Sequence, residues 1–257
     1  MAKKHLIIPD TQCKPGHSFE YLSWIGQYIV DQKPDVVIQI GDFADMESLS
    51  SYDQGKKSFE GRRYVKDVQA AKDAMDVLLS PLRKAQEKAK RNKEKIYKPR
   101  LVLTLGNHEA RIKRAINDDP KLEGLIKYED LPYMDWEVHD FLSPVFIDGV
   151  AYCHYFPTGV MGRPATSASA MVNKLHMSCV AGHQQGKQIA YGKRPDGSTI
   201  TCIIAGSCYE HDEGYLDHQT NKHWRGVVVL HEVEDGCFDE MFTSLNYLKR
   251  KYGQTTA

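Results

Sequence analysis

The sequence predicts an α/β fold in which two β-sheets pack face to face between outer helices. Three observations lead to this prediction. The N-terminal part has the pattern strand, helix, strand, which gives a βαβ unit with a parallel strand pair. The second half contains apolar runs separated by turn residues, as in β-hairpins. Polar residues that can bind metals follow several apolar runs, as expected where strands end in a ligand crevice.

The first elements form the βαβ unit. The apolar runs at residues 5–9 and 35–40 predict two buried strands. Between them, Ser18 is a suitable N-cap for a helix over residues 19–32, where apolar side chains recur at helical spacing. The Lys33-Pro34 pair is expected to end that helix.

The middle of the chain predicts a polar loop over residues 46–62 and then a long helix over about residues 64–95, which Pro81 can kink. The highly charged tail of this helix permits two interpretations, a nucleic-acid contact or a solvated helix end. We favour the solvated end, since Glu87 and Glu94 interrupt the basic run.

The remaining elements are a third strand, two further helices and a mostly antiparallel set of strands. In order, we expect a strand at 100–105, a helix at 111–116, a hairpin at 145–147 and 151–154, a helix at 166–175, a strand at 178–181, and hairpins at 188–191 with 199–204 and 225–232 with 237–242. No linker separates them. We therefore expect one domain over residues 1–257, with a long helical insertion at about 46–98.

Composition gives bounds on function. Lys+Arg and Asp+Glu both number 34, so there is no general basic field to attract nucleic acid, although local patches are compatible with this balance. The 6 cysteines are scattered and form no C-x-x-C pair, which indicates a reduced, cytoplasmic protein. No run approaches the ~20 apolar residues of a membrane span. The N-terminal apolar stretch is also too short for a signal peptide.

The most informative feature is an ordered series of metal-ligand residues, each at the end of an apolar run. The series is Asp10-Thr11-Gln12, Gly41-Asp42-Phe43-Ala44-Asp45, Gly106-Asn107-His108-Glu109, His154, and Gly182-His183-Gln184-Gln185. Carboxylate, amide and imidazole ligands without clustered cysteines suit hard or borderline divalent metals. This is the ligand set of a two-metal site that activates water against a phosphoester.

The order and spacing of this series resemble the calcineurin-like metallophosphoesterases. That family has D-x-H, G-D-x-x-D, G-N-H-[DE], a lone His and G-H-x-H. The second and third motifs match here as GDFAD and GNHE, and the motifs cover the chain from Asp10 to Gln185. The first and last motifs depart in the same way, because Gln12 and Gln185 stand where the family has His. The pattern is also similar to family members encoded by bacteriophages.

The resemblance implies a two-sheet β-sandwich flanked by helices and a ligand for each position. It implies that Asp42 bridges two divalent ions, with Asp10, Gln12 and Gln185 completing one site. The other site would then be completed by the three residues Asn107, His154 and His183. Manganese is the expected metal, with Mg, Fe, Zn or Ni as alternatives, because neutral amide oxygens harden and weaken the first site.

The resemblance also suggests catalytic residues. His108 matches the family's general acid, and Asp45 or Glu109 could orient it. Arg111 and Arg114 could hold substrate phosphate, although surface solvation is the more ordinary interpretation of both. The segment from Tyr209 to Trp224, rich in histidines and aromatic residues, could be a substrate loop or an ordinary surface loop.

We therefore expect a metal-dependent phosphoesterase that leans to phosphodiester, nucleotide or nucleic-acid substrates. A protein phosphatase or other phosphomonoesterase is an alternative, but Met46 stands where the protein phosphatases have Arg after GDxxD. The other alternative is a non-catalytic binding protein on a decayed esterase scaffold, which the two glutamine replacements favour.

Overall fold

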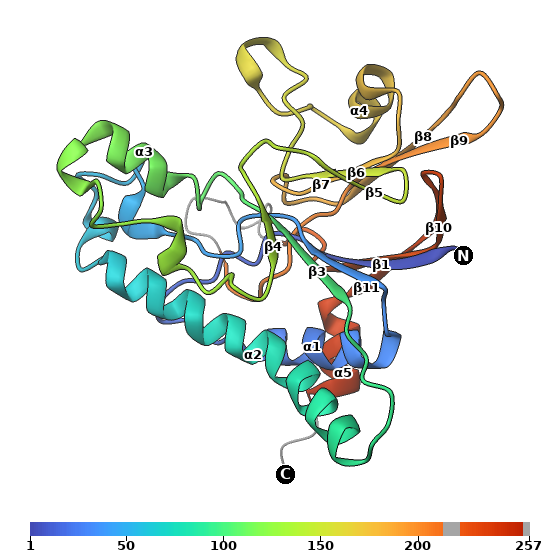
Figure 1. Ribbon diagram of the computed structural model, residues 1–257. Coiled ribbons are helices and arrows are strands. Elements are labelled where there is room, and N and C mark those ends of the chain that lie inside the picture. Colours follow the sequence, from blue (N-terminus) through green and yellow to red (C-terminus); the bar gives the residue numbers. More distant parts are fainter. Residues whose placement is uncertain (213–221, 254–257) are drawn as a thin grey trace.

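The computed structural model describes residues 1–212 and 222–253 as an α/β arrangement of two mixed sheets flanked by helices (Figure 1). One sheet has six strands in the order β11-β10-β1-β2-β3-β4, and the other has five in the order β5-β6-β7-β9-β8. None of the helices in these residues is long and apolar enough to cross a bilayer.

The six-stranded sheet contains the βαβ unit predicted from the sequence. Its strands are β1 (Lys3–Ile8), β2 (Val36–Gln39), β3 (Arg100–Thr104), β4 (Glu137–His139), β10 (Gly226–Glu234) and β11 (Cys237–Ser244). Strands β1 to β4 are parallel, whereas β10 runs antiparallel to β1. All the carboxyl ends of β1, β2 and β3 therefore point to one edge of the sheet.

The five-stranded sheet is more parallel than the sequence analysis predicted. Its strands are β5 (Val145–Ile147), β6 (Val150–Cys153), β7 (Cys179–Ala181), β8 (Gln188–Lys193) and β9 (Thr199–Ile204). The hairpins β5–β6 and β8–β9 are antiparallel as expected, but β6–β7 and β7–β9 are parallel. Short apolar runs do not reveal their direction, and the helix and loops between them permit a parallel return.

The helices lie outside the two sheets. Helices α1 (Glu20–Gln32), α2 (Tyr64–Arg91) and α5 (Leu245–Tyr252) cover the six-stranded sheet, and α4 (Ala168–Leu175) covers the five-stranded sheet (Figure 1). The period-two alternation of strand residues divides the core accordingly. Leu6 and Ile8 face the helices, while Ile7 faces the other sheet.

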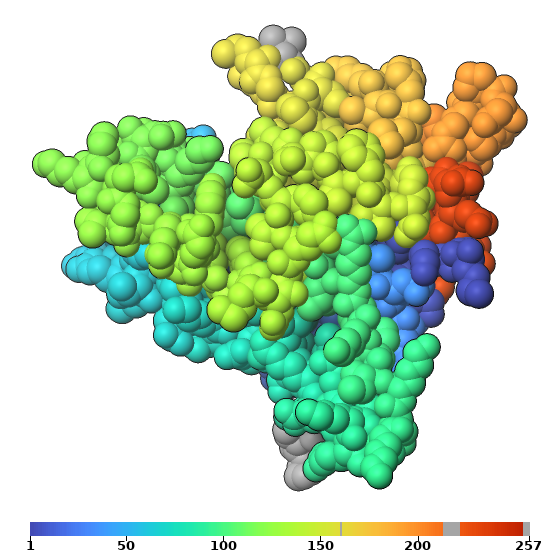
Figure 2. Space-filling view, viewed as in Figure 1, coloured from blue at the N-terminus to red at the C-terminus, as the bar shows by residue number. Residues whose placement is uncertain are grey.

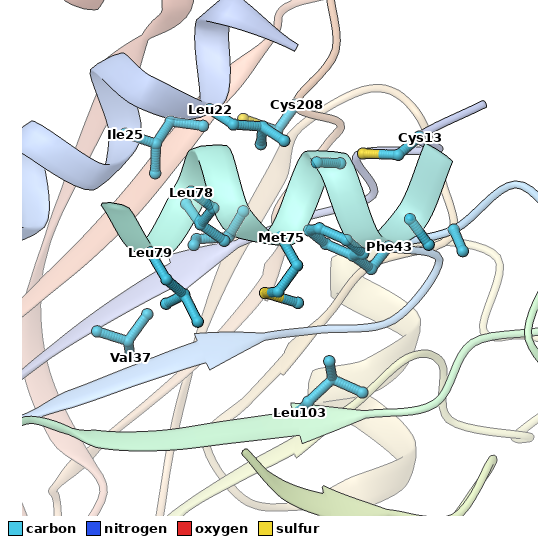
Figure 3. Packing of buried hydrophobic residues seen from close by; sticks show 14 of the residues in the cluster. Cys13, Leu22, Ile25, Val37, Phe43, Met75, Leu78, Leu79, Leu103 and Cys208 are labelled. Atoms are coloured by element: carbon cyan, nitrogen blue, oxygen red, sulfur yellow. The ribbon is translucent and has the colours of Figure 1, made fainter. Parts of the chain in front are cut away.

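The long helix α2 packs its apolar face on α1 and on the sheet. Met75, Leu78 and Leu79 point from α2 toward residues of α1, β2 and β3 (Figure 3). The helix continues through Pro81, and it ends at Arg91, before the predicted Lys95. Gly26 of α1 makes the close helix contact possible, because a Cβ there would lie 2.3 Å from the carbonyl oxygen of Leu78.

The structure contains two elements that were not predicted from the sequence, and one helix begins at a different cap from the predicted one. Strand β4 and helix α5 were not predicted, since β4 is a short edge strand and α5 is strongly charged. The N-cap of α1 is Phe19 and not Ser18. The Ser18 hydroxyl nevertheless accepts a hydrogen bond from the Glu20 amide at 3.2 Å. Short one-turn helices interrupt the loop expected at residues 46–62.

Candidate metal centre

Five strand ends place the predicted ligands around one point. β1, β2 and β3 lead to Asp10, Asp42 and Asn107, respectively. β6 and β7, from the other sheet, lead to His154 and His183. The centre therefore lies where the carboxyl ends of parallel strands from both sheets meet.

The loops that carry these residues approach one another closely. A Cβ on Gly106 would lie 2.1 Å from Oδ1 of Asp42, so only glycine fits directly before Asn107. The backbone is left-handed at Gln12 (φ 42°), Asp42 (φ 51°) and His183 (φ 68°). Such conformations are uncommon for residues other than glycine and persist where the surrounding structure enforces them.

The two histidines converge on the side chain of Asn107. Nε2 of His154 lies 3.0 Å from Oδ1 of Asn107 and 3.2 Å from Oδ2 of Asp42. Nδ1 of His183 lies 2.8 Å from the same Asn107 oxygen. Nδ1 of His154 lies 2.9 Å from the carbonyl oxygen of Ile40, which can only accept. Nδ1 therefore carries a proton and donates it to the Ile40 carbonyl, which directs Nε2 to the centre, as such partners do for histidines that bind metals.

Two buried carboxylates, those of Asp10 and Asp42, lie at the centre, and their pKa values shift in opposite directions. Burial raises the pKa of Asp10 to about 7, although His154 opposes the rise. Burial opposes ionisation of Asp42 as well, but His108 and His154 hold its pKa well below its ordinary value. Burial would lower the pKa of His154, yet the charge and hydrogen bond of Asp42 raise it to about 9. A proton on His154 thus supplies positive charge that a bound cation would also supply.

His183 differs from His154. Burial and the charge of His154 lower the pKa of His183 to about 4, so its imidazole is neutral at physiological pH. A neutral imidazole can offer a lone pair to a metal. One donor atom each from Asp42, His154 and His183 lies within 4.8 Å of the others, and among residues 1–212 and 222–253 this is the one such group.

The two glutamines stand in different surroundings. Oε1 of Gln12 is buried and has no hydrogen-bond partner, which leaves a carbonyl lone pair free for a cation. Gln185 donates from Nε2 to Oδ2 of Asp10 at 3.4 Å and accepts a hydrogen bond from the Tyr209 hydroxyl at 2.8 Å. Gln185 thus points an N–H group toward Asp10, where a metal ligand would need an oxygen.

His108 forms a buried pair with Asp45 beside the centre. Nδ1 of His108 donates to Oδ1 of Asp45 at 2.8 Å, and Nε2 lies 3.7 Å from Oδ2 of Asp42. Burial would lower the pKa of His108, but the two carboxylates raise it. Lys14 lies 3.5 Å from the other oxygen of Asp45, and Arg111 lies 3.3 Å from Oδ1.

Glu109 does not orient His108, which was one of the two predicted arrangements. Its carboxylate accepts hydrogen bonds from the backbone amides of Asp42, Ala44 and Gly106 at 3.1, 3.0 and 2.8 Å. The Tyr133 hydroxyl donates a fourth at 3.0 Å. Glu109 therefore joins the GDFAD and GNHE loops from inside the protein.

The structure separates the two arginines of α3 (Arg111–Asp118). Arg111 is largely buried, and its Nη2 lies 3.3 Å from Nε2 of His108, so the solvated interpretation is wrong for this residue. Arg114 is exposed. Of the aromatic segment after Tyr209, residues 213–221, including His218, lie outside the described residues.

One residue at the centre was not predicted from the sequence, and the place of another was left open. Lys14 follows the first motif, and its ion pair with Asp45 could not be foreseen because a lysine outside a motif gives no signal. Tyr209 is fully buried against Gln185 and belongs to a segment whose proximity to the metals was only one of two alternatives.

The donor set fits a divalent ion at the group formed by Asp42, Asn107, His154 and His183. The orphaned Gln12 carbonyl and the carboxylates of Asp10 and Asp42 offer oxygen ligands for a second ion, although Gln185 does not as it is oriented here. No model of a known protein family matches the chain, and no curated protein matches its sequence.

Proposed function

We propose that the protein is a metal-dependent phosphoesterase with a sandwich of the calcineurin-like type. The observation that carries this proposal is the convergence of Asp10, Asp42, Asn107, His154 and His183 from five strand ends, with the buried His108–Asp45 pair 3.7 Å from Asp42. Burying two carboxylates beside two imidazoles is costly for the fold, and this cost supports a functional role for the group.

The ligand assignment follows the donors. Asp42, Asn107, His154 and His183 would hold one ion, and Asp10 with Gln12 would hold a weaker one that shares Asp42. Divalent ions at such sites lower the pKa of water and polarise phosphoryl oxygens. Manganese suits a mixed nitrogen and oxygen set with neutral amide ligands.

His108 is proposed as the general acid. In hydrolysis, a water oxygen bonds to phosphorus while the ester P–O bond breaks, and the departing oxygen takes a proton. Nδ1 of His108 is held by Asp45, so Nε2 is the nitrogen that faces the centre and can release a proton. The carboxylates of Asp42 and Asp45 favour the protonated ring that this role needs and outweigh the opposing charge of Arg111.

A binding protein on a decayed esterase scaffold is the second candidate. The hydrogen bond from Gln185 to Asp10 favours it, because that contact closes one side of the first site with a protein donor. The proposed enzyme and this candidate differ in turnover, which is directly measurable.

The test is hydrolysis after metal removal and reconstitution. The protein would first be freed of metal with a chelator. It would then be incubated with Mn²⁺, Mg²⁺ or Zn²⁺ and assayed on p-nitrophenyl phosphate and bis(p-nitrophenyl) phosphate. We expect diester hydrolysis that requires added metal and is greatest with Mn²⁺. Metal binding without turnover on either substrate, or on a broader panel of nucleotides and nucleic acids, would favour the binding protein.

A further inference from the structure

A hollow of about 380 Å³ opens between α3 and the segment that follows β4. Lys113 and Arg114 line it from α3, and Tyr128, Asp140 and Phe141 line it from the other segments. In Figure 2 the lobe formed by α3 and the turns after it lies beside the segment around residues 140–155. The volume is at the lower end of the range of about 300–1,000 Å³ that small-molecule sites occupy.

The hollow is joined to the metal centre by a row of aromatic rings. The Phe141 ring lies 6.4 Å from the ring of the candidate ligand His154 and 5.5 Å from that of Tyr155, between centroids. The Tyr155 ring in turn lies 4.8 Å from that of His183. Phe141 therefore lines the hollow and also lies beside the candidate ligand His154.

The lining combines aromatic faces with cationic charge. Tyr128 and Phe141 are both partly buried and pack on the core, so their rings are held in place without being covered completely. Lys113 and Arg114 are exposed on α3, which begins three residues after His108. Asp140 adds an acceptor, so the lining carries two cations and one anion.

These features select for a planar, polar ring attached to phosphate. Aromatic side chains stack with nucleobases of any sequence, and arginine and lysine attract the phosphate that accompanies the base. A purely apolar ligand would make no polar contact with Lys113, Arg114 or Asp140. A phosphate ester without a ring would not stack on the aromatic side chains.

We propose that this hollow holds the nucleoside of a nucleotide phosphodiester whose phosphorus lies at the metal centre. The base lies against Phe141 and Tyr128, and Arg114 pairs with phosphate. The inference rests on the proposed phosphoesterase function, because it assigns the substrate class of that site.

The test compares two diesters with the same leaving group. Thymidine 5′-(p-nitrophenyl phosphate) carries a nucleoside, whereas methyl p-nitrophenyl phosphate does not. With Mn²⁺ present, we expect kcat/KM to be higher for the nucleoside ester by about ten-fold or more, as base stacking allows. In Phe141→Ala the ratio of the two kcat/KM values falls toward one. Arg114→Gln removes a contact to the phosphate that both esters carry, so it lowers both kcat/KM values and leaves their ratio unchanged.

Matched controls separate the hollow from general effects. Phe146→Ala removes an exposed phenylalanine of β5, and Arg91→Ala removes an exposed arginine at the end of α2. Both lie outside the hollow, and the substrate ratio stays at its parent value in both. A parent ratio near one, or equal losses on both esters in Phe141→Ala, overturns the inference.

A binding measurement distinguishes failure of the inference from failure of the proposed function. If neither ester is hydrolysed with any metal, the phosphoesterase proposal fails. Ligand-observed NMR with thymidine 5′-monophosphate then tests the hollow alone. Saturation transfer to the base protons that disappears in Phe141→Ala upholds nucleoside binding, and its absence in the parent protein overturns it.

A free nucleotide and the end of a nucleic-acid strand carry the same chemical unit. A thymidine dinucleotide and a ten-nucleotide thymidine strand distinguish these sources. If the strand binds more tightly than the dinucleotide, and its affinity falls steeply with salt, the source is nucleic acid, since phosphate contacts release counterions. Equal affinity identifies a small nucleotide. Either source supports the assignment of the hollow. If Phe141→Ala binds both the dinucleotide and the strand as tightly as the parent protein does, the assignment is contradicted.

Discussion

Asp45 holds His108 by a hydrogen bond of 2.8 Å from Nδ1 to Oδ1, inside a buried group that also includes Lys14 and Arg111. Burial would raise the pKa of Asp45, but the hydrogen bond from His108 and the neighbouring cations hold it well below its ordinary value. The carboxylate is therefore ionised, and it fixes which imidazole nitrogen faces the centre.

Replacing this histidine gives the first prediction. His108→Ala should retain metal and slow hydrolysis of an alkyl phosphodiester by about 10²- to 10⁴-fold, the usual contribution of a general acid. A p-nitrophenyl diester should be slowed much less, because p-nitrophenolate leaves without a proton. The measurement is kcat for both substrates with Mn²⁺ present. Equal slowing of both would show that His108 positions phosphate instead.

The positioning role of Asp45 gives a second prediction. Asp45→Asn should move the alkaline limb of the pH–rate profile to lower pH and lower kcat for the alkyl diester more than for the nitrophenyl diester. The reason is that the amide no longer fixes the His108 tautomer or favours its protonated ring. Glu47→Gln is the matched control, since Glu47 lies in the same loop but pairs with Arg62. A profile identical to that of the parent protein would remove Asp45 from the proposed mechanism.

The bridging assignment of Asp42 is tested by metal content. Asp42→Ala should lose both ions and reduce activity by several orders of magnitude, while Gln12→His should bind metal more tightly at the first site. Elemental analysis after gel filtration gives the metal-to-protein ratio for each variant. Two ions retained by Asp42→Ala would mean that this carboxylate is not the shared ligand.

A fourth prediction concerns the hydrogen bonds by which Glu109 joins the GDFAD and GNHE loops. Glu109→Gln keeps the size of the side chain but turns an NH₂ group toward amides that need an acceptor. We expect the free energy of unfolding to fall by about 1–3 kcal/mol, the cost of a buried unsatisfied donor. Urea unfolding measures the change, and Glu129→Gln, at an exposed glutamate, is the control. Unchanged stability would show that the four hydrogen bonds contribute nothing net.

His5 predicts a pH dependence of stability away from the centre. Its ring is buried between the sheets, with Nδ1 2.6 Å from the Tyr152 hydroxyl and Nε2 2.9 Å from Asp148. Burial lowers the pKa of His5 below 6.5, although Asp148 opposes the shift. Below pH 6.5 the unfolded chain therefore binds a proton that the folded protein binds less readily, and stability falls as pH falls.

The measurement is the free energy of unfolding between pH 5 and pH 8 in the parent protein and in His5→Gln. We expect a smaller loss of stability below about pH 6.5 in the variant, because the titrating ring is gone. His231→Gln serves as the control, since His231 is partly exposed. An identical slope in His5→Gln and in the parent would contradict the assignment.

Much of the architecture was predictable because local patterns determine it. Strands β1, β2 and β3 and helices α1 and α2 follow from apolar periodicity, and the hairpin at Asp148-Gly149 follows from its turn residues. The direction of β7 between β6 and β9 was not predictable. It depends on which strands pair, and pairing is a property of the whole sheet.

The candidate site was predictable to the level of which residues meet, and not of how they are held. Motif order placed Asp42, Asn107 and His183 together correctly. The partners of Glu109 and the burial of Arg111 depend on side-chain directions across loops that are far apart in the sequence. No pattern in the chain encodes those directions, because the same residues occur on solvated helix faces.

The proposed ligands come from both sheets, and this origin has a consequence for stability if the protein binds metal. Asp10, Asp42 and Asn107 belong to one layer, and His154 and His183 belong to the other. An ion bound by this proposed ligand set would link the two layers. If it bound only the folded chain, it would stabilise that chain by about 2.7 kcal/mol at a hundred times the dissociation constant. Under the proposed function, loss of the metal would therefore lower the stability of the folded protein as well as its activity, so the folded fraction would depend on the available metal.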